Sequence, residues 1–175
     1  LEKGSEVGAH ILSGAVIDPK GISELFPNWK ELGAPLETPV TDDRWLLLGP
    51  QGSLQLPTFA MPPLVLNHGT YIASLGNVCR WLAEQAEALG VEVYPGMAAS
   101  EAVFDETGAL KGVVAGVFGI QKDGSHGPDY QPGIELHGKY VFIGEGVRGS
   151  LSKQLRAKFA LGEGADPEKY GIGLK

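Results

Sequence analysis

The stretch that decides the fold is Lys139–Arg156, KYVFIGEGVRGSLSKQLR. Its apolar start, residues 140–143, is typical of a buried strand. Three glycines then mark a turn: Gly144, Gly146 and Gly149. Beyond them apolar residues recur at helical spacing: Leu151, Leu155 and Phe159. Strand, glycine turn and helix form the geometry in which backbone N–H groups at a helix start face an anion. A plain tight turn is the alternative interpretation.

Composition favours a folded, loop-rich α/β chain. The 175 residues are 43% hydrophobic and 20% charged, with 26 glycines and 12 prolines. That length suits one domain or a large piece of a bigger protein, and the apolar content suffices for a core. The formal net charge of −7 and the lack of a basic run argue against nucleic acid as a partner.

Several kinds of chemistry are not indicated. The single cysteine, Cys79, excludes an internal disulfide and a cysteine metal site. It falls on the apolar face of a predicted helix, which favours a buried structural thiol. The sequence has no Gly-x-Ser-x-Gly elbow, no His-x-x-x-His pair and no Walker phosphate loop, so it offers no candidate catalytic residue and no metal ligands. No apolar run approaches a membrane span and no signal peptide is visible. The chain starts at Leu1 and stops in an apolar segment, so we expect a fragment or a trimmed chain.

The clearest helix covers residues 70–90, with Gly90 as its C-terminal stop. A strand is expected directly after it at 91–94, and this helix–glycine–strand step is typical of α/β folds. The sequence predicts strands at 44–48 and 53–57, paired as a hairpin, at 98–106 and 110–117, joined by the turn 105–108, and at 134–137, returning into 139–143. Residues 21–32 predict a short helix interrupted at Pro27, 58–66 an extended apolar segment, and 120–133 a loop.

Three places have residues that suit a ligand or a membrane. Glu2, beside Lys3, follows what reads as the end of a strand, where an acidic residue holds the ribose of a dinucleotide; a surface glutamate is the alternative. Ser13 and Gly14 offer a hydroxyl and a bare backbone to a ring or phosphate, or form a simple turn. A third group is aromatic and aliphatic and suits either the core, which the residues favour, or a membrane interface: Leu25, Phe26 and Trp29.

Glycine-rich steps from strand to turn in an α/β frame suit a large cofactor with a pyrophosphate and flat rings. Redox chemistry would then belong to the cofactor, while the protein supplies orientation and electrostatics.

Five segments together resemble one family: LEKG with GAHILSGAVIDP, ELFPNWKELGAPLETPVTDDR, NHGTYIASLGNVCRWLAEQAEALGVEVYPG, FIGEGVRGSLSKQL and YGIGLK. They are similar to the electron transfer flavoprotein–ubiquinone oxidoreductases over nearly the whole chain, although no single segment is specific. Members of that family carry one FAD, one [4Fe-4S] cluster and a ubiquinone site. They take electrons from electron transfer flavoprotein and pass them to quinone in a membrane. Their cofactor domain resembles that of FAD-dependent hydroxylases and geranylgeranyl reductases.

The resemblance implies roles for particular residues. Glu2 and Lys3 would lie at the adenosine ribose, Ser13 and Gly14 beside the flavin or pyrophosphate, and the backbone of Ala98 at the adenine. The turn that contains Gly144, Glu145, Gly146 and Gly149 would lie on the phosphate side. The resemblance also shifts the expectation for Leu25, Phe26 and Trp29 towards a membrane or quinone contact.

The resemblance also implies a domain plan. Residues 1–20 and 68–175 would form part of an FAD-binding domain, and 21–67 an inserted, β-rich region on the membrane and quinone side. The family's glycine-rich first unit and its cysteine-rich cluster domain are absent from this sequence. We therefore expect a central fragment that is inactive and binds FAD weakly or not at all by itself. The complete protein would be peripheral on the bacterial cytoplasmic membrane or on the matrix side of the mitochondrial inner membrane.

Two other interpretations stay open. One is an FAD enzyme of the hydroxylase or isoprenoid-reductase type, which would carry flavin without an iron–sulfur cluster. The other is a non-enzymatic α/β binding module, which would carry neither.

Overall fold

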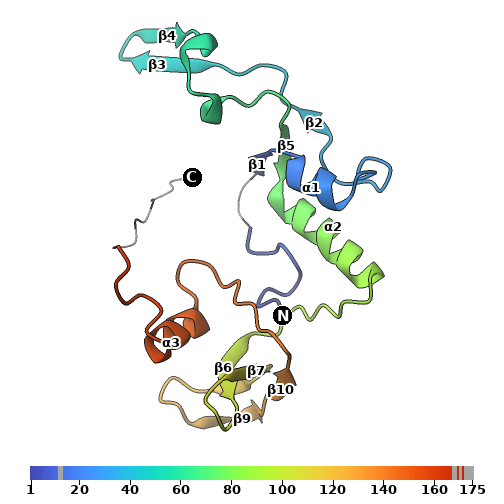
Figure 1. Ribbon diagram of the computed structural model, residues 1–175, viewed down its shortest axis with the longest axis vertical. Helices are drawn as coiled ribbons and strands as arrows, with labels where there is room; N and C mark the ends of the chain where they lie inside the picture. Colours follow the sequence, from blue (N-terminus) through green and yellow to red (C-terminus); the bar gives the residue numbers. More distant parts are fainter. Residues whose placement is uncertain (12–13, 167–168, 170, 172–175) are drawn as a thin grey trace. The chain divides into compact units, whose positions relative to one another are not determined.

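The computed structural model describes residues 1–11, 14–166, 169 and 171, which Figure 1 shows coloured along the chain. The chain divides into two compact units, Glu2–Pro95 and Gly96–Lys175, with Leu1 grouped with the second. We call these the N-terminal unit and the C-terminal unit, and each is described by itself. Both combine helices with small antiparallel sheets, so the expectation of a mixed α and β chain is confirmed.

The N-terminal unit is built on a three-stranded sheet in the order β1 (Gly14–Ile17), β5 (Tyr71–Ser74), β2 (Thr38–Pro39). Helices α1 (Lys20–Leu25) and α2 (Leu75–Ala88) lie next to this sheet (Figure 1). Apolar side chains of these elements and of the segment after α1 make one core: Ile22, Trp29, Ala34, Leu36, Ala73, Val78 and Trp81. Strand β5 runs directly into α2, and the Ser74 hydroxyl accepts a hydrogen bond from the Asn77 N–H (3.4 Å), which caps the helix.

A separate hairpin belongs to the same unit. Strands β3 (Trp45–Gly49) and β4 (Gly52–Leu56) pair in antiparallel register through the turn at 49–52 (Figure 1), as the sequence predicts. Two short 3₁₀ turns follow, η1 (Thr58–Ala60) and η2 (Pro63–Val65), where the sequence predicted an extended segment.

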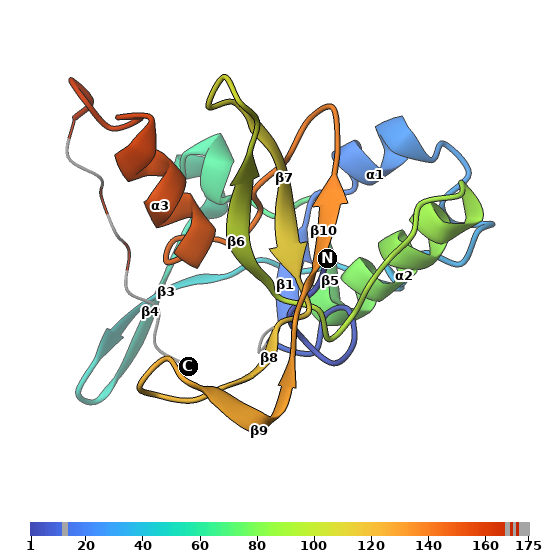
Figure 2. The same ribbon diagram turned by 90° about the horizontal axis from the view of Figure 1, so that it is seen from below.

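The C-terminal unit contains a three-stranded sheet in the order β10 (Ile134–His137), β7 (Leu110–Ala115), β6 (Ala99–Phe104) (Figure 2). The predicted pairing of β6 with β7 is confirmed. Helix α3 (Ser150–Lys158) packs against β6 and buries Leu151 and Leu155, which confirms the helical spacing after the glycine turn. At the end of α3 the Lys158 ammonium lies 4.1 Å from the centre of the Phe104 ring.

Two predicted strands are wrong. Residues 140–143 are irregular, and no strand of the described chain pairs with them, so Phe142 is 94% exposed. Residues 91–94 are also irregular, apart from one parallel bridge between Glu2 and Pro95 that follows them. A strand exists only where a neighbour completes its hydrogen bonds, and an apolar run alone does not supply that neighbour.

The predicted helix at 70–90 begins too early and the predicted loop at 120–133 is partly wrong. Tyr71 and Ile72 belong to β5, because that strand fills the gap between β1 and β2. Residues 126–131 form β9 (His126–Gln131), which pairs with β8 (Phe118–Ile120). Trp81 rather than Cys79 is the buried anchor of α2, and Cys79 is only half-buried.

Candidate functional site

The Glu145 carboxylate binds the backbone N–H groups at the start of α3. The Glu145 carboxylate accepts hydrogen bonds from the Ser152 N–H (2.8 Å), the Ser152 hydroxyl (2.9 Å) and the Leu151 N–H (3.3 Å). These are N–H groups that a helix start leaves without a partner. The sequence predicted that they face a bound anion, and the structure gives them a side chain of the same turn instead.

Gly149 gives Glu145 the room for this contact. A Cβ at Gly149 would lie 2.4 Å from the Glu145 Cβ and from its Oε2, and 2.6 Å from the Ser152 Oγ. Gly149 is buried, and a larger residue there would push the carboxylate away from the helix. Gly146 differs, because its φ of 74° is left-handed and nothing lies near its missing Cβ.

The electrostatic state of Glu145 follows from these contacts. Partial burial of the carboxyl opposes ionisation, but the hydrogen bonds from Ser152 and Leu151 outweigh it, so the pKa of Glu145 lies below its usual value. Glu145 is therefore negatively charged at neutral pH, at the positive end of the α3 dipole.

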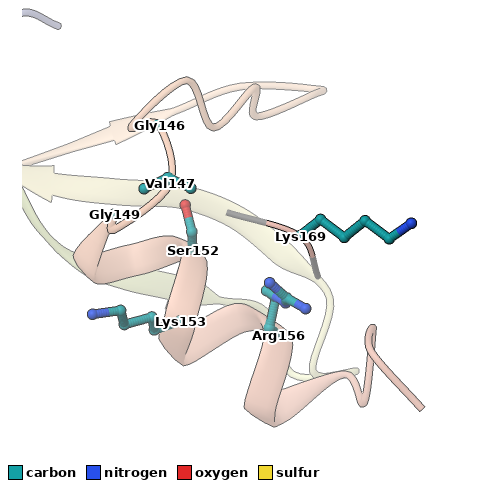
Figure 3. A pocket seen from close by; sticks show the side chains of 7 residues that line it. All are labelled: Gly146, Val147, Gly149, Ser152, Lys153, Arg156 and Lys169. Carbon is teal, nitrogen blue, oxygen red and sulfur yellow. The ribbon is translucent and has the colours of Figure 1, made fainter. Parts of the chain in front are cut away.

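A hollow of about 350 Å³ lies beside the same turn. Figure 3 shows Gly146, Val147 and Gly149 on the turn, while side chains of α3 form another wall. The polar lining is largely basic: Ser152, Lys153, Arg156 and Lys169. An anionic group would find positive charge in this hollow, next to the capped helix start.

Glu2 is held in place by backbone and side-chain hydrogen bonds. Its N–H donates to the Tyr94 carbonyl (2.9 Å), and it forms the parallel bridge with Pro95. The Glu2 carboxylate accepts a hydrogen bond from the Gly4 N–H (2.6 Å), which fixes the side chain, while Lys3 is exposed. Helix α2 is followed by Gly90, with its left-handed φ of 89°, and then by one isolated parallel bridge between Pro95 and Glu2, where the sequence predicted a full strand.

The structure shows backbone contacts for two further predicted residues, Gly14 and Ala98. Gly14 begins β1, where it pairs with Ser74 opposite the start of α2; Ser13 lies outside the described residues. Ala98 is exposed, and its carbonyl accepts a hydrogen bond from the Gly116 N–H (3.2 Å). Glu2 and Gly14 belong to the N-terminal unit, and Ala98 and the glycine turn to the C-terminal unit. That these residues meet at one cofactor stays a prediction.

The three side chains considered for a membrane contact have different environments. Trp29 is 6% exposed, donates from Nε1 to the Ser23 hydroxyl (3.0 Å) and meets the Tyr71 ring edge-on. Phe26 packs against this core and meets the Trp81 ring edge-on. Leu25 is 72% exposed. Of the three, Leu25 is the one whose exposure suits a contact with lipid.

The β3–β4 hairpin exposes apolar side chains that the sequence analysis treated as an ordinary hairpin. Leu47 and Leu48 are exposed on β3 and Leu54 on β4, and Phe59 and Leu64 follow on the 3₁₀ turns, with Leu64 99% exposed. The four consecutive apolar residues at 45–48, without polar alternation, were the signal, because a hairpin with one solvated face alternates.

Among the described residues, no helix is long and apolar enough to cross a membrane. In the same part of the chain, no group of three or more histidine, cysteine, aspartate or glutamate side chains is arranged to hold a metal ion.

Comparison with known proteins shows which proteins the chain is similar to. No family model matches the chain. The chain is 54% identical over 177 residues to the electron transfer flavoprotein-ubiquinone oxidoreductase of Pseudomonas aeruginosa, and the match covers 100% of this chain and 32% of that protein. The mitochondrial proteins of the same name from Dictyostelium discoideum and Bos taurus are 52% and 50% identical, each over 100% of this chain and 28% of their own length. The chain thus spans about a third of the length of these curated relatives, and over its whole length it is similar to a segment of proteins named electron transfer flavoprotein-ubiquinone oxidoreductase.

Proposed function

We propose that this chain is a central segment of an oxidoreductase that passes electrons from electron transfer flavoprotein to ubiquinone. The observation that carries the proposal is identity of 50% or more along the whole chain to proteins that bear this name. The chain itself would supply part of an FAD site and part of the surface that faces the membrane.

The proposed FAD ligands are the residues that the family resemblance implies. Glu2, held by Gly4, would bind the adenosine ribose next to Lys3, while Ser13, Gly14 and the Ala98 backbone would line the cofactor. The parallel bridge between Glu2 and Pro95 supports this arrangement, because an acidic residue at the end of a parallel strand is the usual ribose ligand. When bound, FAD supplies the redox chemistry, and these residues bind and orient it.

The pyrophosphate would lie against the turn of Gly144, Glu145, Gly146 and Gly149. Because the Glu145 carboxylate holds the start of α3, we propose that Glu145 contacts the cofactor through its backbone. The basic hollow beside Gly146 supports a phosphate position there, rather than on the helix axis. Gly144 has open space around its missing Cβ, which allows close approach of a ligand.

The other proposed redox groups would be bound outside this chain. The sequence contains only one cysteine, so the four cysteine ligands usual for a [4Fe-4S] cluster would come from another part of the complete protein. The chain would contribute to the quinone side through residues 21–67, which we propose as an insertion in an FAD domain formed by 1–20 and 68–175.

We further propose that residues 21–67 lie on a membrane surface, the bacterial cytoplasmic membrane or the matrix side of the mitochondrial inner membrane. The exposed leucines of the hairpin, with Leu25, Phe59 and Leu64, support this contact. Burying one leucine side chain in an apolar phase contributes about 1.5–3 kcal/mol, so a few of them suffice for reversible binding.

The FAD site is tested in the complete enzyme with Gly146→Ala and Gly164→Ala. Both glycines have a φ of 74° and open space at the missing Cβ, so the two variants carry the same backbone strain. We expect Gly146→Ala to lose most of the FAD that co-purifies with the enzyme, and Gly164→Ala to keep it. Equal FAD content in both variants would contradict the phosphate role of the turn.

Two further measurements separate the alternatives. A complete protein with flavin but without an iron–sulfur signal would favour the hydroxylase or isoprenoid-reductase type, and a protein with neither would favour a binding module. The isolated 175-residue chain is expected to bind FAD weakly or not at all and to be inactive. Stoichiometric FAD on the purified chain would overturn that expectation.

A further inference from the structure

Residues 4–11 lie against the first two turns of α2 through a contact between two glycines. A Cβ at Gly8 would lie 2.6 Å from the Gly76 carbonyl oxygen and 3.0 Å from the Gly76 Cα. A Cβ at Gly76 would lie 3.1 Å from the Gly8 carbonyl oxygen. Neither backbone can come this close if the partner carries a side chain. Gly8 has in addition a left-handed φ of 83°, which an alanine rarely adopts.

Contacts on both sides of this crossing continue along α2. One turn further on, the Arg80 guanidinium reaches the Glu6 carboxylate (3.4 Å) and the Asn77 side-chain oxygen (2.6 Å). This ion pair is exposed and contributes little by itself. On the other side, Gly14 pairs with Ser74, the capping residue of α2. The start of α2 therefore contacts the chain at Glu6, Gly8 and Gly14.

The segment held in this way connects two residues of the proposed FAD site. At one end, Glu2 is fixed by Tyr94, Pro95 and Gly4. At the other end, Gly14 is fixed by Ser74. Between them the Gly8–Gly76 crossing has no adjustable side chain, so a displacement there moves the backbone itself.

We propose that Gly8 and Gly76 form a glycine lock that positions Glu2 and Gly14 for FAD. The inference rests on the proposed function, and it assigns a positioning role to two glycines through the contact between their backbones. Helix α2 then supports residues 4–11 in addition to packing in the core.

A variant of Gly76 can separate a positioning role from a general loss of stability. Gly76 lies in the first turn of α2, where alanine favours the helix relative to glycine. Gly76→Ala should therefore strengthen α2 as a helix and at the same time move the Gly8 backbone by a few tenths of an ångström. A lower FAD affinity without a loss of thermal stability would separate positioning from folding.

The experiment uses the complete enzyme stripped of FAD and titrated with FAD. The variants are Gly8→Ala, Gly76→Ala and the control Gly33→Ala, because Gly33 has a similar φ of 71° with nothing within 4 Å of its missing Cβ. We expect the dissociation constant for FAD to rise about tenfold to a hundredfold in Gly8→Ala, since small displacements of a positioned group have effects of this size. It should rise severalfold in Gly76→Ala and stay within about threefold in Gly33→Ala. The visible absorption band of the bound flavin should shift in Gly8→Ala and not in Gly33→Ala.

The outcomes distinguish the two claims. If the wild-type enzyme binds FAD and Gly8→Ala matches Gly33→Ala in affinity and spectrum, the lock is refuted while the proposed function stands. If the wild-type enzyme binds no FAD, the proposed function fails and the lock fails with it. If Gly8→Ala does not fold, Gly76→Ala decides, and an unchanged dissociation constant in that variant refutes the lock.

Discussion

Removing the carboxylate of Glu145 is the perturbation whose effect the structure specifies most fully. Glu145→Ala removes three hydrogen bonds at the start of α3, to the Leu151 N–H and to the N–H and hydroxyl of Ser152. Loss of a helix cap costs about 1 kcal/mol, and loss of a charge at the helix start costs about 0.3–1 kcal/mol more. Glu145→Gln keeps the shape and an acceptor oxygen but removes the charge, so it should cost about 0.3–1 kcal/mol.

The assay is hydrogen exchange in the complete protein, read on peptides that cover α3. A loss of about 1–2 kcal/mol in local opening speeds exchange about five- to thirtyfold in Glu145→Ala, and about two- to fivefold in Glu145→Gln. Glu106→Gln is the control, since Glu106 is an exposed carboxylate in the β6–β7 turn of the same unit.

The same variants predict a pH dependence. Since the folded-state pKa of Glu145 lies below its usual value, the stabilisation is present above the ordinary glutamate pKa of about 4.3 and is lost as pH falls through the lower, folded value. Protection of α3 in the wild type should therefore decrease in acid, and Glu145→Gln should lack that decrease. Exchange of α3 that is the same in both Glu145 variants and in Glu106→Gln would refute the capping role.

Two further predictions concern the N-terminal unit. Trp29→Ala should lower the local unfolding free energy of the core by about 3–5 kcal/mol, because it empties a buried site and removes the hydrogen bond to Ser23. Trp45→Ala, on the exposed hairpin, is the control and should cost far less. Equal losses in the two variants, measured by hydrogen exchange, would contradict the burial of Trp29. Leu48→Glu should weaken binding of the complete enzyme to phospholipid vesicles about tenfold or more in a sedimentation assay, because it places a charge where an exposed leucine would enter lipid. Gln51→Glu adds the same charge at the hairpin turn and serves as a second variant. If both variants bind vesicles as the wild type does, the hairpin does not contact the membrane.

Local signals in the sequence predicted much of the fold. The helical spacing of Leu151 and Leu155, the glycine after α2 and the glycine–proline turn between β3 and β4 each act within a few residues. Propensity, turn chemistry and periodicity therefore sufficed for α3, most of α2 and the hairpin.

The wrong predictions depend on partners that are distant in sequence. Residues 91–94 and 140–143 have strand composition, but in the described chain only the Glu2–Pro95 bridge gives either segment a neighbour. Tyr71 and Ile72 fit a helical period, yet they form β5 because β1 and β2 bind on its two sides. Periodicity does not report such pairings, since each is completed by residues far along the chain.

The sequence predicted the glycine turn and the helix after it, but not the group that binds the start of that helix. The glycines of the turn were identified, but the anion at α3 is Glu145 itself, which lies six and seven residues before the N–H groups that it binds. Sequence rules for helix caps look at the residue just before the helix, here Gly149, and so they miss this carboxylate. The Gly8–Gly76 crossing was likewise invisible, because two glycines far apart in sequence carry no pairing signal.

The most direct test of the central claim, that this chain holds FAD in the complete enzyme, is a hydrogen-exchange comparison of that enzyme with and without FAD. We expect FAD to slow exchange in residues 2–14 and 144–149 and to leave exchange in the β8–β9 hairpin unchanged. A footprint that spares both segments while FAD is bound would contradict it.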